Sequence, residues 1–214
     1  MSRKIVVFDM DKTLGDFDLI SFLYGQLKQH TSIFKILDVF FECFRPNIFS
    51  IFTMIHEYKL SGIIEKVVLY TNNTGGTEWV KHIIDYIHYK LNFILFDHLI
   101  TALYVNRGDI PDLRRRSIEK TYTDLRNILQ IDAKTIVIFI DDAYHAKMLH
   151  AKVKYIHIAP YNYHFDNHTI LNKIKYINPD WNICLPSQRY YVKYKYNENI
   201  SKKLFNTLTY YITA

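Results

Sequence analysis

Short runs of apolar, β-branched and aromatic residues recur along the chain, and each run ends abruptly in polar residues. Continuous apolar runs of this length are typical of strands that are buried on both faces of a parallel sheet. Four runs fit the pattern: Lys4–Phe8, Lys66–Tyr70, Thr135–Ile140 and Val153–Ile158. A weaker candidate strand lies at His98–Val105. The pattern therefore predicts a sheet of parallel strands.

Segments with helical spacing of apolar residues separate these runs. The clearest are Glu78–Tyr89, Ser117–Leu129 and Ala143–His150. Strands that alternate with helices indicate an α/β, Rossmann-like domain, a parallel sheet with helices on both faces. Ligands of such sheets bind beyond the carboxyl ends of the strands. We expect one domain over residues 1–214.

Two segments differ in texture from this alternation. Residues 19–60 are mostly helical by periodicity, are divided at Pro46, and are predicted to form a small helical insert after the first strand. The Phe- and Ile-rich stripe Ile33–Phe52 is expected to pack on the sheet or over the site, with a partner-binding surface as the alternative. Residues 178–214 are predicted to be an extension around the domain's edge. Tyr and Lys alternate over Tyr190–Tyr196, which favours an edge strand, with stacking on single-stranded nucleic acid as the alternative.

Composition and charge narrow the class of protein. Hydrophobic residues make up 49% of the 214 residues, enough for a substantial core, and the net charge of +6 favours anionic partners such as phosphate groups. Cys43 and Cys184 lack metal-binding spacing, and the ten histidines do not match a zinc site. Without a signal peptide or an uninterrupted apolar span, we expect a soluble protein of the cytoplasm or nucleus that does not contact membranes.

Polar clusters follow three of the predicted strands directly. They are Asp9-Met10-Asp11-Lys12-Thr13, Thr71-Asn72-Asn73 and Asp141-Asp142. An isolated Asp-x-Asp is more often a loop or a helix cap, but here a second acidic pair ends another strand of the same sheet. Carboxylates that share one crevice repel each other and raise each other's pKa, so they bind a divalent cation. Oxygen ligands favour Mg²⁺.

The order and content of these clusters resemble the haloacid dehalogenase superfamily. Asp9-Met10-Asp11-Lys12-Thr13-Leu14 is similar to its motif I, DxDxT, Thr71 to motif II, and Asp141-Asp142 to motif IV, within residues 4–158. The resemblance implies a phosphohydrolase in which Asp9 is the nucleophile that forms an aspartyl-phosphate and Asp11 is the general acid and base. It also implies Mg²⁺ held by Asp9, the main-chain carbonyl of Asp11, and the pair Asp141 and Asp142. Thr71, with its neighbour Asn72, would bind the phosphate.

The superfamily also needs a cation between motifs II and IV, which we expect to bind the phosphate. Lys120 fits best, because it precedes a predicted helix that leads into the motif IV strand. The run Arg114-Arg115-Arg116 is the alternative. That run is expected to be a solvated helix start, or else an anchor for phosphate.

A narrower resemblance concerns the substrate. Arg45-Pro46 opening a helix before the motif II strand is similar to the carboxy-terminal-domain phosphatases of RNA polymerase II, the NLI-interacting-factor-like proteins. Motif I departs from their DLDETL, and their sheet insertion after motif II is absent or short. The resemblance implies a phosphorylated macromolecule, such as a phosphoprotein, as substrate. A nucleic-acid end, a small phosphometabolite, and a non-catalytic binding protein of the same fold remain alternatives. The bias toward Tyr, Phe, Ile, Asn and Lys suggests an AT-rich genome, and a large DNA virus is the expected source.

Overall fold

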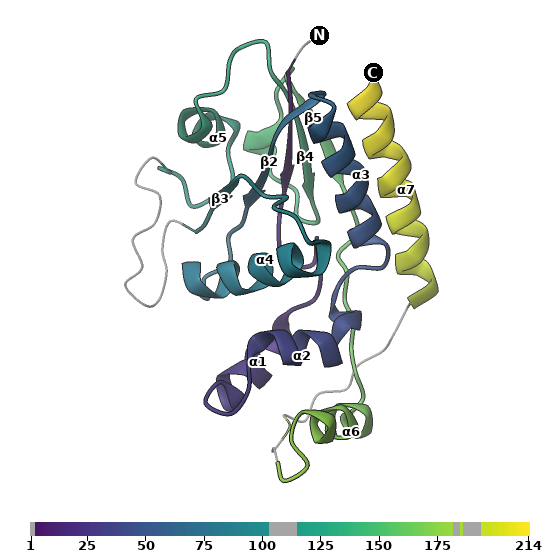
Figure 1. The fold of residues 1–214 in the computed structure, drawn as a ribbon. Helices are drawn as coiled ribbons and strands as arrows, with labels where there is room; N and C mark the ends of the chain where they lie inside the picture. The colour runs from purple at the N-terminus through teal and green to yellow at the C-terminus, as the bar shows by residue number, and fades with distance from the viewer. Residues whose placement is uncertain (1–2, 103–114, 182–184, 186–193) are drawn as a thin grey trace.

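The computed structural model describes residues 3–102, 115–181, 185 and 194–214. Five parallel strands form one sheet in the order β3-β2-β1-β4-β5 (Figure 1). Their bounds are β1 Lys4–Phe8, β2 Ile64–Tyr70, β3 His98–Ile100, β4 Ile136–Asp141 and β5 Val153–His157. The α/β class and the parallel sheet predicted from the sequence are therefore confirmed. The weaker strand is present as β3, and residues 103–105 of that prediction lie outside the described residues.

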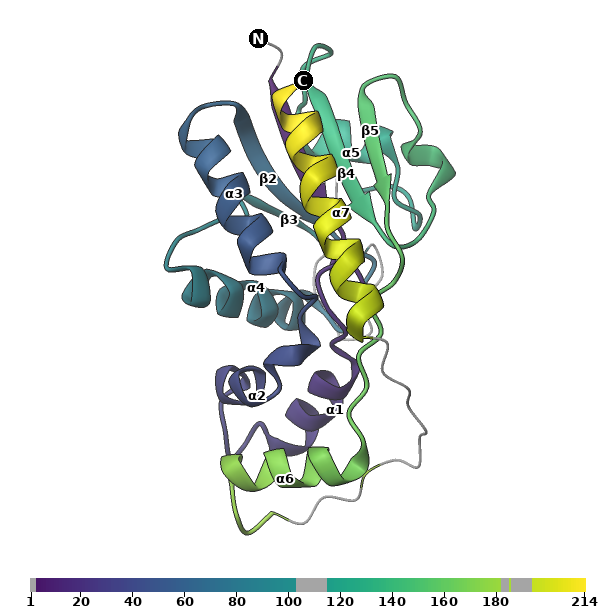
Figure 2. The same ribbon diagram turned by 90° about the vertical axis from the view of Figure 1, so that its right-hand side faces the viewer.

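Helices cover both faces of the sheet, because successive strand residues point to opposite sides. Val6 and Phe8 of β1 belong to the core that includes α3 (Ile48–Leu60), α4 (Thr77–Leu91) and α7 (Tyr194–Thr213). Ile5 and Val7 belong to a second core, which includes α5 (Tyr122–Leu129). Figure 2 shows α3 and α7 side by side on one face, with α5 on the other side of the sheet.

Two of the predicted helices differ from the structure. The helix predicted at Ser117–Leu129 begins only at Tyr122, because Thr121 caps it through Oγ1, which accepts a hydrogen bond of 3.0 Å from the Asp124 N–H. The helix predicted at Ala143–His150 is wrong, since this segment forms only the short 3₁₀ helix η2 (Ala146–Met148). The N–H groups of Ala143 and His145 bond instead to Asp141 Oδ1 and Tyr155 Oη, at 2.8 and 3.0 Å. These side chains replace the hydrogen bonds of a helix.

The chain near its C-terminal end is helical where we predicted an edge strand. α7 starts at Tyr194, so the strand prediction is wrong for residues 194–196, while residues 190–193 lie outside the described part of the chain. The buried residues Leu204, Leu208 and Ile212 recur at intervals of four, which is a helical face. That spacing starts after the Tyr/Lys alternation on which the strand prediction depended.

Three helices and a 3₁₀ turn gather beyond the carboxyl ends of the strands, and we call this group the helical module (Figures 1 and 2). It consists of α1 (Asp18–Leu27), α2 (Ile33–Val39), η1 (Phe41–Cys43) and α6 (Asn167–Ile177). Within residues 19–60, α3 lies instead against the sheet, beside β2. The Phe/Ile-rich stripe shares its buried residues with the core of the sheet, as the packing interpretation expects. Cys43 is a buried free thiol, and Cys184 lies outside the described residues.

Within the described part of the chain, we find no helix with the length and apolar character needed to cross a membrane.

Candidate active site

The strand order brings the three polar clusters together. β1 pairs with both β2 and β4, and Phe8, the last residue of β1, lies opposite Leu69 and Ile140. The clusters that follow these strands therefore meet at one edge of the sheet. The chain also reverses its direction of progress across the sheet here, since β2 and β3 lie on one side of β1 and β4 and β5 on the other. Such a reversal forms a crevice at the carboxyl ends of the strands, where open α/β sheets bind ligands.

A buried lysine joins the two strands that carry the acidic pairs. Lys120 Nζ donates a hydrogen bond of 2.7 Å to Asp141 Oδ2 and another to Asp9 Oδ1. All three side chains are buried, with Lys120 only 2% exposed. The loop that carries Lys120 is fixed next to it, where the N–H of Thr121 donates to Tyr70 Oη at 3.2 Å. Of the two cation candidates predicted from the sequence, Lys120 is therefore the one that contacts these carboxylates.

The protonation of this trio follows from burial and charge. Burial raises the pKa of Asp9 to about 7, against the opposing effect of the Lys120 ammonium, and the charge of Asp141 raises it further. Burial opposes the charged form of Lys120, but the two carboxylates outweigh it and raise the pKa of Lys120. Burial likewise opposes ionisation of Asp141, yet hydrogen bonds from His145 and Lys120 lower its pKa. The ammonium and the Asp141 carboxylate are therefore both charged at neutral pH, whereas Asp9 titrates close to neutral pH.

Asp11 is held by the loop between β2 and α4. Asn73 Nδ2 donates to Asp11 Oδ2 at 2.8 Å. The same loop is ordered by two further bonds, from the Asn73 N–H to Thr71 Oγ1 at 3.0 Å and from the Gly75 N–H to Asn73 Oδ1 at 2.7 Å. Burial raises the pKa of Asp11 although the Asn73 amide opposes this. Asn73 is a site residue that we did not predict; its only sequence signal is its place in Thr71-Asn72-Asn73.

Thr13 fixes the second residue of the acidic pair after β4. Its Oγ1 donates to Asp142 Oδ1 at 3.0 Å and accepts from the Asp142 N–H at 3.0 Å. Carboxylate oxygens of Asp9, Asp141 and Asp142 lie within 4.8 Å of one another. These hard oxygen donors fit a divalent cation such as Mg²⁺. Among the described residues, the carboxylate of Asp11 is not part of this group of three. The atom of Asp11 that we predicted to bind the metal is its main-chain carbonyl oxygen, not its carboxylate.

Arg115 has a place that the sequence did not suggest. It is 1% exposed, so the expectation of a solvated arginine run is wrong for this residue, while Arg114 lies outside the described residues. Its guanidinium donates to the carbonyls of Thr71 and Thr101 at 3.0 and 2.6 Å, and it also bonds to the Asn72 amide oxygen. Arg115 thus ties together the carboxyl ends of β2 and β3. It also bonds to the side chain of Asn72, the predicted phosphate ligand.

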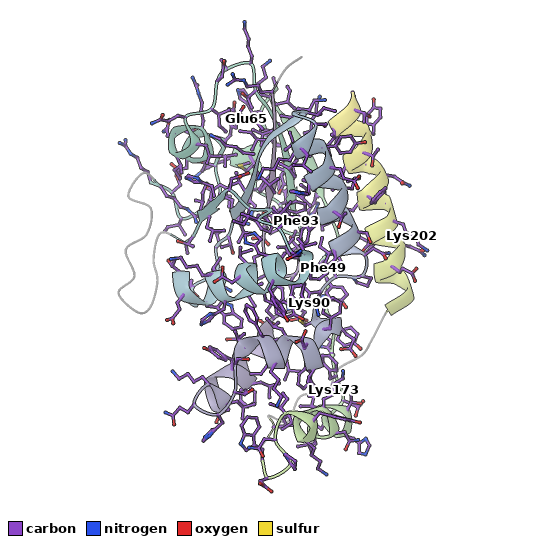
Figure 3. All side chains as sticks on the ribbon, in the orientation of Figure 1. Phe49, Glu65, Lys90, Phe93, Lys173 and Lys202 are labelled. Carbon is purple, nitrogen blue, oxygen red and sulfur yellow. The ribbon has the colours of Figure 1, made fainter. Side chains whose placement is uncertain are left out.

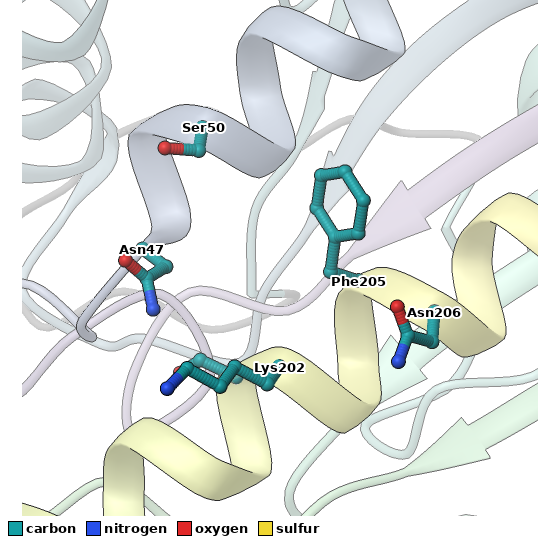
Figure 4. Close-up of a pocket in the computed structure, with 6 residues that line it drawn as sticks. Asn47, Ser50, Lys202, Phe205 and Asn206 are labelled. Atoms are coloured by element: carbon teal, nitrogen blue, oxygen red, sulfur yellow. The ribbon is translucent and has the colours of Figure 1, made fainter.

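A separate groove lies between the first turn of α3 and the side of α7 (Figure 4). Its volume is about 370 Å³, and it is lined by Asn47, Ser50, Ser201, Lys202, Phe205 and Asn206. No carboxylate lines it, so among the described residues the metal-binding donor set belongs to the edge of the sheet and not to this groove.

No family model, curated protein or solved structure matches this chain. The fold and the site therefore define its class on their own, as an α/β protein with an acidic cluster and a buried lysine at the switch point of a parallel sheet.

Proposed function

We propose that the protein is a Mg²⁺-dependent phosphohydrolase of the haloacid dehalogenase type, which cleaves a phosphomonoester through an aspartyl-phosphate on Asp9. The observation that carries the proposal is the meeting of Asp9, Asp141 and Asp142 around the buried Lys120. Three carboxylates, one buried cation and a neighbouring acid are the groups that phosphoryl transfer needs.

The first step is assigned to Asp9 and Asp11. Lys120 holds Oδ1 of Asp9, which leaves Oδ2 to attack phosphorus. A bond forms between Oδ2 and phosphorus while the bond to the leaving oxygen breaks, and that oxygen takes its proton from Asp11. Burial raises the pKa of Asp11, a direction that favours the protonated form in which an acid donates.

The second step returns the site to its starting state. Asp11, now ionised, takes a proton from water as the water oxygen attacks phosphorus, and the bond between phosphorus and Asp9 Oδ2 breaks. Inorganic phosphate leaves with Asp9 restored. Thr71 and Asn72 are proposed to bind the phosphate oxygens, and Lys120 to offset their charge. A bound Mg²⁺, held by Asp9, Asp141 and Asp142 with the Asp11 carbonyl, would neutralise charge on the transferring group.

The proposed substrate is a phosphorylated macromolecule, a phosphoprotein first, in the cytoplasm or nucleus. The narrower motif likeness and the small size of the helical module support this choice over a small metabolite. Phosphopeptides measured beside 3′- and 5′-phosphorylated oligonucleotides separate it from a nucleic-acid end phosphatase.

Hydrolysis of an aryl phosphate with Mg²⁺ tests the chemistry. We expect Asp9→Asn to lower turnover by about 10⁴-fold or more, as for other nucleophiles. Asp11→Asn should lower it by roughly 10²- to 10⁴-fold, the usual contribution of a general acid. Asp85→Asn, an exposed carboxylate on α4, is the matched control and should keep the wild-type rate. Wild-type rates in Asp9→Asn would rule out the nucleophile, and a wild-type protein without turnover on a panel of phosphoesters would favour the binding protein.

A further inference from the structure

One arginine outside the carboxylate cluster holds the loop that carries Asp11. Arg45 lies between η1 and α3 and is 1% exposed. Its Nε donates to the Thr13 carbonyl at 2.7 Å, and its Nη2 donates to the carbonyls of Lys12 and Ala159 at 2.7 and 2.9 Å. Its own N–H bonds to the Leu14 carbonyl at 2.9 Å. The side chain thus forms hydrogen bonds to the carbonyl groups of the two residues that follow Asp11.

Three segments that are distant in sequence cross at this arginine. The Asp16 N–H donates to the Cys43 carbonyl at 2.7 Å, which joins the loop after β1 to the segment before α3. The Tyr161 N–H donates to the Lys12 carbonyl at 2.8 Å, which adds the segment after β5. The crossing is close, since a Cβ on Gly15 would lie 2.6 Å from the Cys43 carbonyl oxygen. The Lys12 carbonyl therefore accepts from both Arg45 and the segment after β5.

The loop after β1, to which Arg45 bonds, includes a residue with a strained backbone conformation. Lys12 has a φ of 58°, in the left-handed region that non-glycine residues rarely adopt. Such a conformation persists when its surroundings over-determine it, and it is common where a loop presents functional groups. Lys12 stands between Asp11, the proposed acid, and Thr13, which holds Asp142. A change in its conformation would move both carboxylates.

The charge of Arg45 is costly for a purely structural contact. Among the described residues no carboxylate lies within ion-pair distance of it, and its Nη1 has no hydrogen-bond partner. Burial lowers the pKa of Arg45 to about 10, and the nearby charge of Asp142 opposes this shift. The guanidinium lies 5.6 Å from the centre of the Tyr161 ring, but a buried cation with no carboxylate partner is less favourable than an apolar residue of similar size. Packing alone therefore does not account for an arginine here, whereas its fork of donors suits two adjacent carbonyls.

We propose that Arg45 is a positioning residue for the hydrolysis. By fixing the Lys12 and Thr13 carbonyls, it sets the position of Asp11 and, through Thr13 Oγ1, the position of Asp142. It does so without touching the reacting atoms, and it couples the helical module to the site. The proposal rests on the function proposed above.

Arg45→Lys, measured against a matched control, tests the role. Lys173→Met is that control, because Lys173 on α6 (Figure 3) also donates to a backbone carbonyl, Val39 O at 2.7 Å, and to Glu42, but belongs to contacts inside the helical module. We expect Arg45→Lys to lower kcat for an aryl phosphate roughly 10- to 100-fold with little change in KM, since small displacements of catalytic groups cost this much. Lys173→Met should lower the melting temperature and leave kcat unchanged.

A second variant covers the case in which Arg45→Lys does not fold. Thr13→Val keeps the volume but removes the hydroxyl that holds Asp142, so it should lower kcat and raise the Mg²⁺ concentration needed for half-maximal turnover. An Arg45→Lys protein with wild-type kcat would overturn the proposal. Equal losses in Arg45→Lys and Lys173→Met would overturn it as well, because they would show a structural role only.

An NMR comparison keeps this inference separate from the proposed function. In Arg45→Lys the backbone amide signals of Asp11 and Asp142 should shift, and in Lys173→Met they should stay in place. If the wild-type protein turns over no phosphoester, the proposed function fails, and unchanged amide signals in Arg45→Lys would then reject the positioning role on its own.

Discussion

On one face of the sheet α3, α4 and α7 pack against Val6 and Phe8, whereas on the other face α5 packs against Ile5 and Val7. The same alternation continues past the end of β1. Met10 continues the first face and is fully buried, and Asp9 continues the second face toward Lys120. We call these the packing face and the site face.

β4 divides in the same way. Ile138 and Ile140 belong to the core of the packing face, while Val137 and Phe139 lead on the site face to Asp141. Because side chains alternate along a strand, one face of β4 packs in the core while the other positions a residue of the site. Burying carboxylates and an ammonium costs stability, and the apolar contacts on the opposite side of the same strands offset that cost. Substitutions on the two faces should therefore have different signatures.

The largest effect is expected from removing the buried cation on the site face. Lys120→Met leaves Asp9 and Asp141 without their partner, and we expect a loss of about 3–5 kcal/mol in the free energy of unfolding at neutral pH. Both carboxyl pKa values should rise in the variant, so its folded state binds more protons than its unfolded state. Its stability is then greatest at low pH and falls as the pH rises from about 4, the unfolded value, through the raised folded pKa.

Urea denaturation in EDTA at pH 4.5 and pH 7.5 measures this prediction. The defect of Lys120→Met should be smaller at the lower pH. Lys173→Met, in the helical module, should show a defect that changes little between the two pH values. Equal defects of Lys120→Met at both pH values would contradict the picture of two unpaired carboxylates.

The next effect comes from the cation that the site face is proposed to bind. Mg²⁺ at about a hundred times its dissociation constant should stabilise the fold by about 2.7 kcal/mol. Thermal unfolding with MgCl₂, compared with NaCl at equal ionic strength, measures it. Asp142→Asn should reduce the shift strongly, and Asp85→Asn should retain it. A shift of the same size in NaCl would mean that screening, rather than a site, is responsible.

A smaller effect should follow from loosening Asp11. Asn73→Ala removes the amide that donates to Asp11 Oδ2 at 2.8 Å, and we expect a loss of about 1 kcal/mol in stability. If the hydrogen bond orients the acid in the reaction, turnover should fall roughly tenfold, which corresponds to about 1.4 kcal/mol in the barrier. Steady-state kinetics on Asn73→Ala and Asn73→Asp measure the change. An unaltered kcat in Asn73→Ala would show that the hydrogen bond from the β2–α4 loop does not orient Asp11 for the reaction.

The smallest effects compare two helix caps. Thr121 caps α5 on the site face at 3.0 Å, and Ser32 caps α2 in the helical module at 3.3 Å. Replacement of either by alanine should cost about 0.5–1 kcal/mol. Thr121→Ala should also lower turnover, because Thr121 follows Lys120 directly, whereas Ser32→Ala should not. Equal kinetics in the two variants would show that the site tolerates movement of the loop before α5.

The sheet and most of its strands could be predicted because each strand carries its own local signal. Short continuous apolar runs mark β1, β2, β4 and β5. The polar residues that follow the strands mark the edge of the sheet at which the site lies. Asp9 and Asp141 could be named in the same way, and Lys120 from the resemblance to the superfamily; the structure brings these three together. Their catalytic roles stay predictions.

The features that could not be predicted from the sequence depend mostly on contacts between residues that are distant in the chain. The missing helix at 143–150 is replaced by bonds to Asp141 and Tyr155, which no local pattern encodes. Arg115 reads as a surface charge in sequence, and it is buried because carbonyls of β2 and β3 surround its guanidinium. α7 was missed because the Tyr/Lys alternation over residues 190–196 resembles a strand. The apolar positions spaced four apart, which indicate a helix, come only later in the sequence.

The crossing at Arg45 also bears on the order in which the chain is made. Tyr161 donates to the carbonyl of Lys12, so the loop that follows the first strand receives one of its fixing bonds from residues that a ribosome adds much later. Closing contacts of long sequence separation is slow, because the entropy of loop closure must be overcome before the contact stabilises the chain. A nascent chain that has not yet reached Ala159 can hold Asp9 at the end of β1, but it lacks the Tyr161 N–H that bonds to the Lys12 carbonyl and the Ala159 carbonyl that accepts from Arg45. Competence for the proposed chemistry would therefore come late in synthesis, after the sheet itself is complete.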